Sequence, residues 1–179
     1  MIGRDEVGKV VVRYLERFPG EADRLAEFSA ALAAGGEIIA RTGVPGHVTA
    51  SAVVTDPAGR MLHVAHNTLK RWLQPGGHLE PGDTSLVAAA VREVEEETGI
   101  APDLLALVDD LPFDIDVHAI PANPVKGEPA HFHFDVRYRF TTVDEPATRA
   151  QLDEVGGVAW LTVDQVEPAF ARKLPRWRA

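Results

Sequence analysis

The chain has 179 residues, of which 45% are hydrophobic and 25% are charged, so it can form one ordinary globular domain and is neither disordered nor fibrous. It contains no cysteine, which excludes disulfides, thiolate metal sites and cysteine nucleophiles. Its 18 basic and 27 acidic residues give a formal net charge of −9, and this balance disfavours generic binding to nucleic acid or to a membrane surface.

The N-terminal 42 residues predict a pair of helices. Apolar residues recur at steps of three and four until Phe18-Pro19-Gly20 ends the first helix, and these positions are Val7, Val10, Val11, Tyr14 and Leu15. A second helix is expected from about Glu21 to Ala34, before Gly35 and Gly36. The segment lacks the apolar core of a signal peptide, and no apolar run approaches the roughly 18 residues that span a bilayer. We therefore expect a cytoplasmic protein whose helical extension, residues 1–42, packs on the main domain and could mediate a homodimer.

Residues 43–179 predict one domain in which strands and helices follow one another at irregular spacing. Strands are expected at residues 47–55 and 60–65, joined by the turn Asp56-Pro57-Ala58-Gly59, and later at residues 113–120, 131–141 and 158–161. A loop rich in glycine and proline, residues 74–82, precedes a helix from about Ser85 to Thr98. Asp83 or Thr84 is expected to cap this helix, and Gly99 to end it. The order of elements indicates an α/β fold with a mixed sheet and helices against it.

The helix at residues 85–98 carries three carboxylates on one side. At about 100° per residue, Glu93, Glu96 and Glu97 fall within an arc of about 100°, whereas Glu95 points elsewhere. Like charges at these spacings repel one another and destabilise a helix. A hard divalent cation with oxygen ligands, such as Mg²⁺ or Mn²⁺, would offset that repulsion. The preceding glycines can bring backbone groups close to such an ion or to a phosphate.

The segment Gly76 to Ile100 resembles the signature box of the Nudix hydrolases. That box has a glycine, five residues, a glutamate, seven residues, and then Arg-Glu-aliphatic-x-Glu-Glu-x-Gly-aliphatic. Gly77 matches its first position, and residues 92–100, Arg-Glu-Val-Glu-Glu-Glu-Thr-Gly-Ile, match its second half completely. Asp83 stands where glutamate is usual, and the following spacer is one residue longer. Both departures fall where the loop meets the helix, and they raise the question of whether Asp83 reaches Arg92 or the metal. The resemblance covers about residues 46 to 166.

The resemblance implies a Nudix-type α/β/α sandwich that hydrolyses the phosphoanhydride of a nucleoside diphosphate linked to another moiety, with Mg²⁺ or Mn²⁺. Gly77, Glu93, Glu96 and Glu97 would be metal ligands, one of the last two would share in water activation, and Arg92 would orient a carboxylate. Glu154 is our candidate for a further base, although it reads equally well as an exposed turn residue. The alternative is a non-catalytic nucleotide sensor of the same fold. An isoprenoid diphosphate isomerase, which also resembles this fold, relies on a cysteine that the chain lacks.

Two of the predicted strands carry polar side chains along one face each. These are Asp114, Asp116 and His118 in the first strand, and His131, His133, Asp135, Arg137 and Arg139 in the second. If the strands pair, the two faces merge into one patch. We hypothesise that the patch lines the substrate cavity, where His131, His133 and Arg137 would contact phosphate or sugar. The alternative is the solvated outer face of a half-buried sheet.

Histidines raise two further interpretations. His78 lies inside the glycine loop and is the best placed of the histidines beside the box to touch a phosphate. Two histidines two apart on a strand with a nearby carboxylate can also bind zinc or iron. Because the three glutamates already account for a metal, we favour the carboxylate site over this second one. The substrate is expected to be a small nucleotide derivative, and the sequence leaves its leaving group open.

Overall fold

The computed structural model describes residues 2–125, 127–151 and 155–166. Its α-helices are α1 (Arg4–Arg17), α2 (Ala26–Ala34) and α3 (Leu86–Thr98), and short 3₁₀ turns lie at Pro19–Glu21, Asp23–Leu25 and Pro102–Leu104. Its strands are β1 (Gly46–Thr55), β2 (Met61–His66), β3 (Arg71–Leu73), β4 (Gly76–His78), β5 (Ala106–Leu107), β6 (Asp114–Ile120), β7 (His131–Thr141) and β8 (Val155–Leu161).

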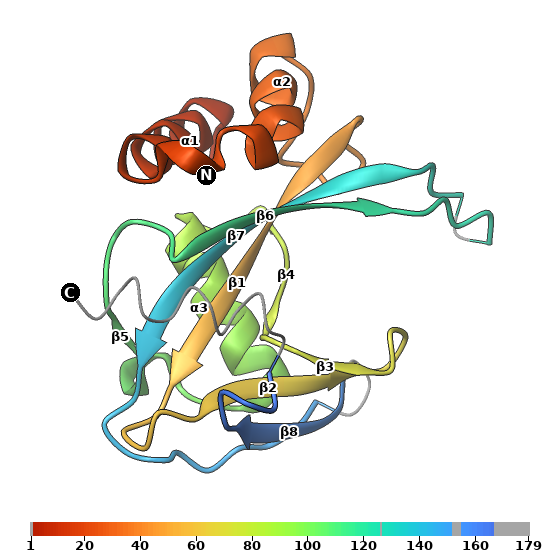
Figure 1. Ribbon diagram of the computed structural model, residues 1–179. Coiled ribbons are helices and arrows are strands. Elements are labelled where there is room, and N and C mark those ends of the chain that lie inside the picture. The colour runs from red at the N-terminus through yellow and green to blue at the C-terminus, as the bar shows by residue number, and fades with distance from the viewer. Residues whose placement is uncertain (1, 126, 152–154, 167–179) are drawn as a thin grey trace.

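The strands form one mixed sheet around β1 (Figure 1). β1 runs parallel to β7 over its whole length, so that Gly46 lies opposite Phe132 and Thr55 opposite Thr141. The other pairs are antiparallel: β2 and β4 lie along β1, β5 and β6 lie along β7, and β3 and β8 lie along β2. The mixed sheet with its helices confirms the predicted α/β class.

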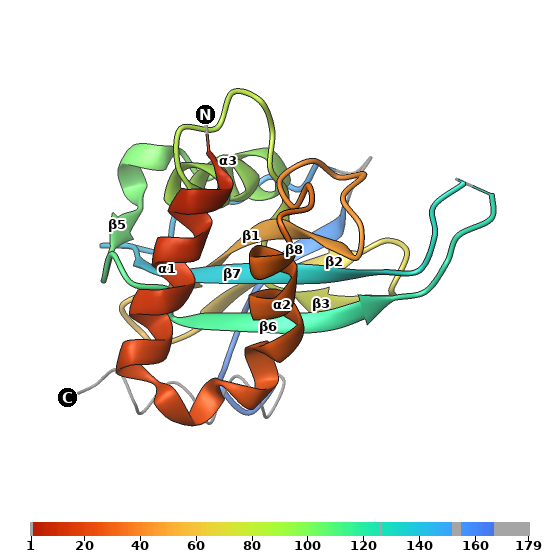
Figure 2. The same ribbon diagram turned by 90° about the horizontal axis from the view of Figure 1, so that it is seen from above.

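One face of β1 and β7 is apolar and holds the core. Its buried side chains alternate along the two strands and are Val48, Ala50, Ala52 and Val54 with Phe134, Val136, Tyr138 and Phe140. α3 adds Leu86, Ala89, Ala90 and Val94 to the same cluster, and α1 and α2 add Val7, Val11, Tyr14, Phe28 and Ala31. Phe28 stacks on Phe134 with 4.4 Å between ring centroids. The N-terminal helices therefore share the core of the main domain, and Figure 2 shows them lying across β6 and β7.

The short strands β3 and β5 were not predicted, and β8 begins three residues earlier than expected. Three further differences have a clear physical reason. The second helix begins at Ala26, not Glu21, because residues 19–25 form 3₁₀ turns and Leu25, with ψ near 10°, interrupts the α conformation. Ser85, not Asp83 or Thr84, caps α3, since its hydroxyl accepts the amide of Ala88 at 3.0 Å. The loop at residues 74–82 contains the short strand β4, which the glycines allow to lie close against β1.

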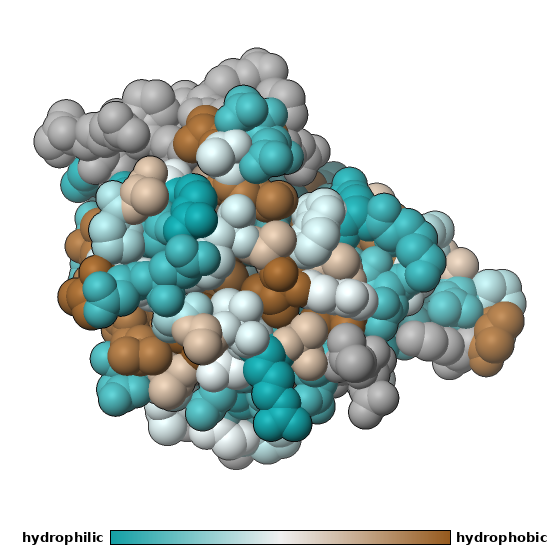
Figure 3. All heavy atoms as spheres, turned by 90° about the horizontal axis from the view of Figure 1, so that it is seen from below, coloured by the Kyte–Doolittle hydropathy of each residue, from teal (hydrophilic) through white to brown (hydrophobic). Residues whose placement is uncertain are grey.

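Hydrophilic and hydrophobic residues are interspersed over the described surface seen from below (Figure 3). Within the part of the chain that the structure describes, no helix is both long enough and apolar enough to cross a membrane.

Candidate functional site

α3 begins and ends at well-defined caps, and one side of this helix faces the glycine loop, residues 74–82. Ser85 caps the first turn, and Gly99 ends the helix in a left-handed conformation with φ of 71°, where its amide donates to the carbonyl of Glu95. Within these limits Glu93 and Glu97 are 8% and 7% exposed, whereas Glu95 and Glu96 are exposed. Burial of two of the three carboxylates indicates that they face the molecule and not solvent.

β4 lies directly against these carboxylates. The amide of Gly76 donates a hydrogen bond of 3.0 Å to Oε2 of Glu97. A Cβ atom on Gly77 would lie 2.6 Å from Oε1 of Glu93, closer than carbon and oxygen can approach. Gly77 is therefore required for the approach of β4 to α3, and the structure places it beside Glu93 as the resemblance implies.

Arg92 connects the loop to the helix. Its guanidinium donates to both oxygens of Asp83 at 3.1 Å, to Oε1 of Glu93 at 2.9 Å and to Oε2 of Glu96 at 2.7 Å. It also donates to the backbone carbonyl of His78 at 2.9 Å. These contacts answer the question raised by the altered box, because Asp83 reaches Arg92 with both oxygens despite its shorter side chain.

The ion pairs of this site shift the pKa values of both partners. Burial acts to raise the pKa of Asp83, but hydrogen bonds from Arg92 and from the amide of Glu80 hold it below its ordinary value. Hydrogen bonding to Asp83 raises the pKa of Arg92 above its ordinary value. Asp83 is therefore ionised at neutral pH and acts as an anchor for the guanidinium.

The residues present fit a hard divalent cation. Asp83, Glu93 and Glu96 contact the guanidinium of Arg92, and Glu97 accepts a hydrogen bond from the amide of Gly76, so four carboxylates gather beside the glycine loop. The donor atoms are all oxygens, which suit Mg²⁺ and Mn²⁺. We call Glu93, Glu96 and Glu97 the carboxylate cluster.

The predicted patch of polar side chains on β6 and β7 lies on the face of the sheet opposite to the apolar face against which α3 packs. β6 and β7 pair so that Asp114 faces Arg137, Asp116 faces Asp135 and His118 faces His133. The two polar faces therefore merge, as the alternation predicted. Asp114 and Asp135 are each only 4% exposed, so this part of the patch is not a solvated outer face. We use the name polar face for the side chains on this side of three strands. They are Asp114, Asp116 and His118 of β6, His131, His133, Asp135 and Arg137 of β7, and His47, Thr49 and Ser51 of β1.

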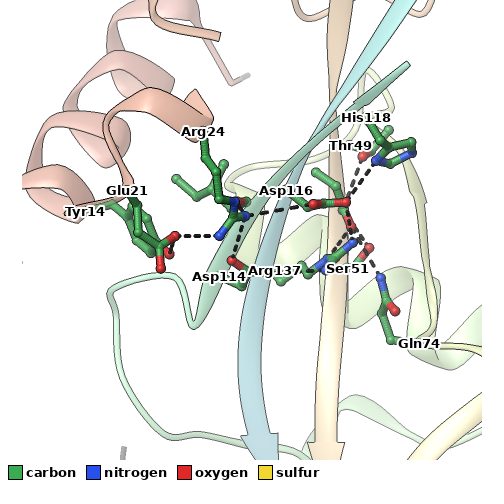
Figure 4. Close-up of polar contacts among 12 residues, drawn as sticks. Tyr14, Glu21, Arg24, Thr49, Ser51, Gln74, Asp114, Asp116, His118 and Arg137 are labelled. Carbon is green, nitrogen blue, oxygen red and sulfur yellow. Dashed lines mark hydrogen bonds and ion pairs between the residues drawn. The ribbon is translucent and has the colours of Figure 1, made fainter. Parts of the chain in front are cut away.

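Arg137 is the centre of the polar face (Figure 4). It donates to Asp135 at 2.7 Å, to Asp116 at 2.9 Å and to Asp114 at 3.2 Å. Burial acts to lower the pKa of Arg137, but the surrounding carboxylates, with Asp135 foremost, raise it above its ordinary value. Its guanidinium thus neutralises buried aspartates, and its predicted contact with phosphate stays a prediction.

Neighbouring groups complete this network. Ser51 and Thr49 donate to Oδ1 of Asp135 at 2.6 and 3.2 Å, and Gln74 donates to its Oδ2 at 3.3 Å. Arg24, from the 3₁₀ turn before α2, donates to the carbonyl of Ile115 at 2.8 Å and reaches Asp114 (Figure 4). The N-terminal extension therefore supplies a cation to the edge of the polar face.

Histidines occupy the end of the polar face nearest to β4. His78 lies opposite Thr49, and its ring centroid is 5.3 Å from that of His133. His131 donates from Nδ1 to the carbonyl of Pro129 at 2.8 Å. Burial lowers the pKa of His78 to about 4 and that of His133 to about 3, so both are neutral at pH 7. The structure therefore brings His78, His131 and His133 together, while Glu154 lies outside the described residues.

His47 is a residue of this region that the sequence analysis missed. It is 1% exposed, and its ring lies 4.7 Å from that of His133 and 5.0 Å from that of His78. The polar alternation of His47, Thr49 and Ser51 along β1 was the signal that could have placed it on the polar face. Its pKa is lowered to about 4 by burial and by the neighbouring His131.

A cavity of about 620 Å³ adjoins the glycine loop. It is lined by three segments, namely residues 2–4 where the chain enters α1, residues 37–41 and the loop residues Leu79, Glu80 and Pro81. Its lining combines apolar side chains with two arginines, Arg4 and Arg41, and two glutamates, Glu37 and Glu80. A cavity of this size can hold a small ligand.

The chain is similar to proteins of one known family. The family model described as NUDIX domain matches residues 45–178. An uncharacterized Nudix hydrolase NudL of Citrobacter koseri is 38% identical over 61 residues, which is 34% of this chain and 32% of that protein. Phosphatase NudJ of Escherichia coli is 49% identical over 57 residues, 31% of this chain and 36% of that protein. The chain thus spans about a third of the length of the curated relatives it matches.

One of the similar solved structures is a binary complex of the Caenorhabditis elegans Ap4A hydrolase. It superimposes with a TM-score of 0.56 at 19% sequence identity, and the match covers 73% of this chain and 96% of that chain. At this identity the likeness shows the fold.

Proposed function

Because the chain belongs to the Nudix family, we propose that it hydrolyses the phosphoanhydride bond of a nucleoside diphosphate linked to another moiety, with Mg²⁺ or Mn²⁺ as cofactor. The observation that carries this proposal is the carboxylate cluster beside the glycine loop. Glu93 and Glu97 are buried against β4, and Arg92 holds Asp83, Glu93 and Glu96 in fixed positions. Carboxylate oxygens gathered in this way are the ligands that Mg²⁺ and Mn²⁺ prefer, and a pyrophosphate brings such cations with it.

The chain's residues divide the work between binding and proton transfer. Glu93, Glu96 and Glu97, with the carbonyl of Gly77, would hold the cation, which screens the phosphate charge and polarises the reacting bond when it is bound. One of Glu96 and Glu97 accepts a proton from the attacking water. Arg92 is a positioning residue, since its contacts fix the carboxylates and the carbonyl of His78. Glu154 stays our candidate for a further base.

We place the substrate beside the glycine loop, residues 74–82. The cavity beside Leu79, Glu80 and Pro81 offers room for the part of the substrate that the reaction does not change. His78, His131, His133 and Arg137, on the polar face, remain the proposed contacts to phosphate or sugar, which His78 and His133 would make directly or through a metal that they bind. The relatives carry names such as phosphatase and Ap4A hydrolase, which favour a phosphate ester or anhydride and leave the leaving group undetermined.

A substrate panel tests this proposal. Nucleoside triphosphates, ADP-ribose, dinucleoside polyphosphates, coenzyme A and sugar nucleotides are incubated with the protein and Mg²⁺ or Mn²⁺, and release of nucleoside monophosphate and phosphate is measured. Glu97→Gln should lower kcat by about 100-fold or more on the best substrate. Glu95→Gln is the matched control, because Glu95 is an exposed glutamate of the same helix.

The same panel distinguishes the sensor alternative. If one compound binds tightly and none is cleaved, the protein is a nucleotide sensor of Nudix fold. If Glu97→Gln and Glu95→Gln both cleave at the wild-type rate, the carboxylate cluster has no catalytic role and the proposal is wrong.

A further inference from the structure

Five of the seven histidines of the chain gather at one end of the polar face: His47, His78, His118, His131 and His133. The strand register brings them together, because His47 and His118 both lie opposite His133, on either side of β7. His78 joins them from β4, where it lies opposite Thr49. Four strands therefore contribute to a cluster that no single stretch of sequence reveals.

His47 is the residue that requires an explanation. It is 1% exposed, and neither of its ring nitrogens makes a hydrogen bond of normal geometry among the described residues, although the backbone of Gly43 lies nearby. Buried polar groups in proteins nearly always have a partner, since burial without one loses the hydrogen bonds that water would supply. A buried imidazole whose nitrogens face other imidazoles is explained by a ligand that the rings share.

We propose that His47, His78 and His133 bind a transition-metal cation, with Zn²⁺ as the expected occupant. Each ring offers one nitrogen, and these three nitrogens all lie within 4.8 Å of one another. Nitrogens bound to one tetrahedral zinc ion lie about 3.4 Å apart, so closure requires only small movements of the side chains. Three histidines form an established zinc ligand set, and imidazole also suits copper, iron and nickel.

The surroundings complete the site. Since the carbonyl of Pro129 can only accept, Nδ1 of His131 carries a proton, and Nε2 is the nitrogen through which this ring would bind a metal. The His131 ring lies 4.9 Å from that of His47 and 5.2 Å from that of His133. The fourth position of the metal then falls to His131 or to water. His118 lies further out, 5.5 Å from His133, and its Nδ1 is hydrogen-bonded to Asp116.

This nitrogen site is separate from the carboxylate cluster. The carboxylates contact Gly76 and Gly77 from the side of α3, whereas the ring of His78 lies with His47 and His133 on the polar face. Oxygen ligands select magnesium or manganese, and nitrogen ligands select zinc and its neighbours. β4 lies between the two, so a metal on His78 would fix the strand that shapes the carboxylate cluster.

Metal binding to the chelator-treated protein tests the proposal. Calorimetry with Zn²⁺ in excess Mg²⁺ should find one equivalent per chain, and Co²⁺ should give the visible absorption of a four-coordinate nitrogen site. His133→Gln and His78→Gln should each weaken Zn²⁺ binding by at least 100-fold. His63→Gln should leave it unchanged, because His63 is a buried histidine on β2 outside the cluster. Glu97→Gln should also retain it.

Thermal unfolding gives a second readout that does not depend on activity. Zn²⁺ should raise the Tm of the wild-type protein and leave that of His133→Gln unchanged. Should the buried His47→Gln variant fail to fold, the variants of His78 and His133 still decide the matter, since both side chains are only half-buried. Absence of stoichiometric Zn²⁺ binding would overturn the proposal. So would binding that survives His133→Gln and His78→Gln but is lost in Glu97→Gln.

Discussion

Arg92 donates a hydrogen bond of 2.9 Å from its guanidinium to the backbone carbonyl of His78. This bond joins α3 to β4, and the same guanidinium holds Asp83 and two glutamates of the carboxylate cluster. The ring of His78 meanwhile lies with His47 on the polar face of the sheet. One residue of β4 thus contacts the carboxylate network through its backbone and the histidine cluster through its side chain.

Asp83→Asn should destabilise the protein by about 1–3 kcal/mol, because an amide replaces a charged side chain that is 6% exposed and accepts three hydrogen bonds. Urea denaturation at pH 7.5 measures this loss. Asp103→Asn, at an exposed aspartate, should change stability by less than about 0.5 kcal/mol. Equal stability of the two variants would show that Asp83 does not anchor Arg92.

Arg137→Gln should cost about 3–5 kcal/mol, since it leaves buried aspartates without the cation that neutralises them. Urea denaturation is again the measurement, and Arg13→Gln is the control, because the ion pair of Arg13 with Asp110 is exposed and its loss should change stability little. A variant that is stable but raises KM would instead favour contact of Arg137 with the substrate. Wild-type stability together with wild-type kinetics would exclude both roles.

His63 should make the protein less stable in acid. Burial lowers the pKa of His63 in the folded protein, whereas in the unfolded chain this group titrates near its ordinary value of about 6.5. As the pH falls below about 6.5, the unfolded chain therefore takes up a proton that the folded protein does not, and unfolding is favoured. The stability of the wild type relative to His63→Gln should fall between pH 7.5 and 5.5, as measured by urea denaturation at both values. A difference that does not change with pH would contradict this.

Local sequence patterns predicted the framework of the fold. The three- and four-residue spacing from Val7 to Leu15 predicted α1, and Gly99 predicted the end of α3. The alternation in residues 113–120 and 131–141 predicted both β6 and β7 and the merging of their polar faces. These features are set by neighbours in sequence, since helix and strand periodicity places side chains on faces before any packing occurs.

Elements too short to show a periodic pattern, and contacts that depend on a single side chain, were predicted less well. β3 and β4 have three residues each, too few to show alternation, and β4 exists because Gly76 and Gly77 let the chain pass between Ser51 and Glu93. The cap of α3 was assigned to Asp83 or Thr84, but the carboxylate of Asp83 is committed to Arg92, which leaves Ser85 to accept the helix amide. Competition between two partners for one side chain is decided by distances that the sequence does not contain.

The order of residues by itself determined that Glu93, Glu96 and Glu97 share one side of a helix after a glycine loop. In an α-helix the spacing of residues along the sequence fixes the side on which each of them lies. Only the folded chain decided that Asp83 closes on Arg92, that Arg137 is surrounded by aspartates, and that His47 meets His78 and His133. Those contacts join residues that are up to 86 positions apart in the chain, and they depend on strand register. Register is set by the burial of the whole apolar face and not by any one segment.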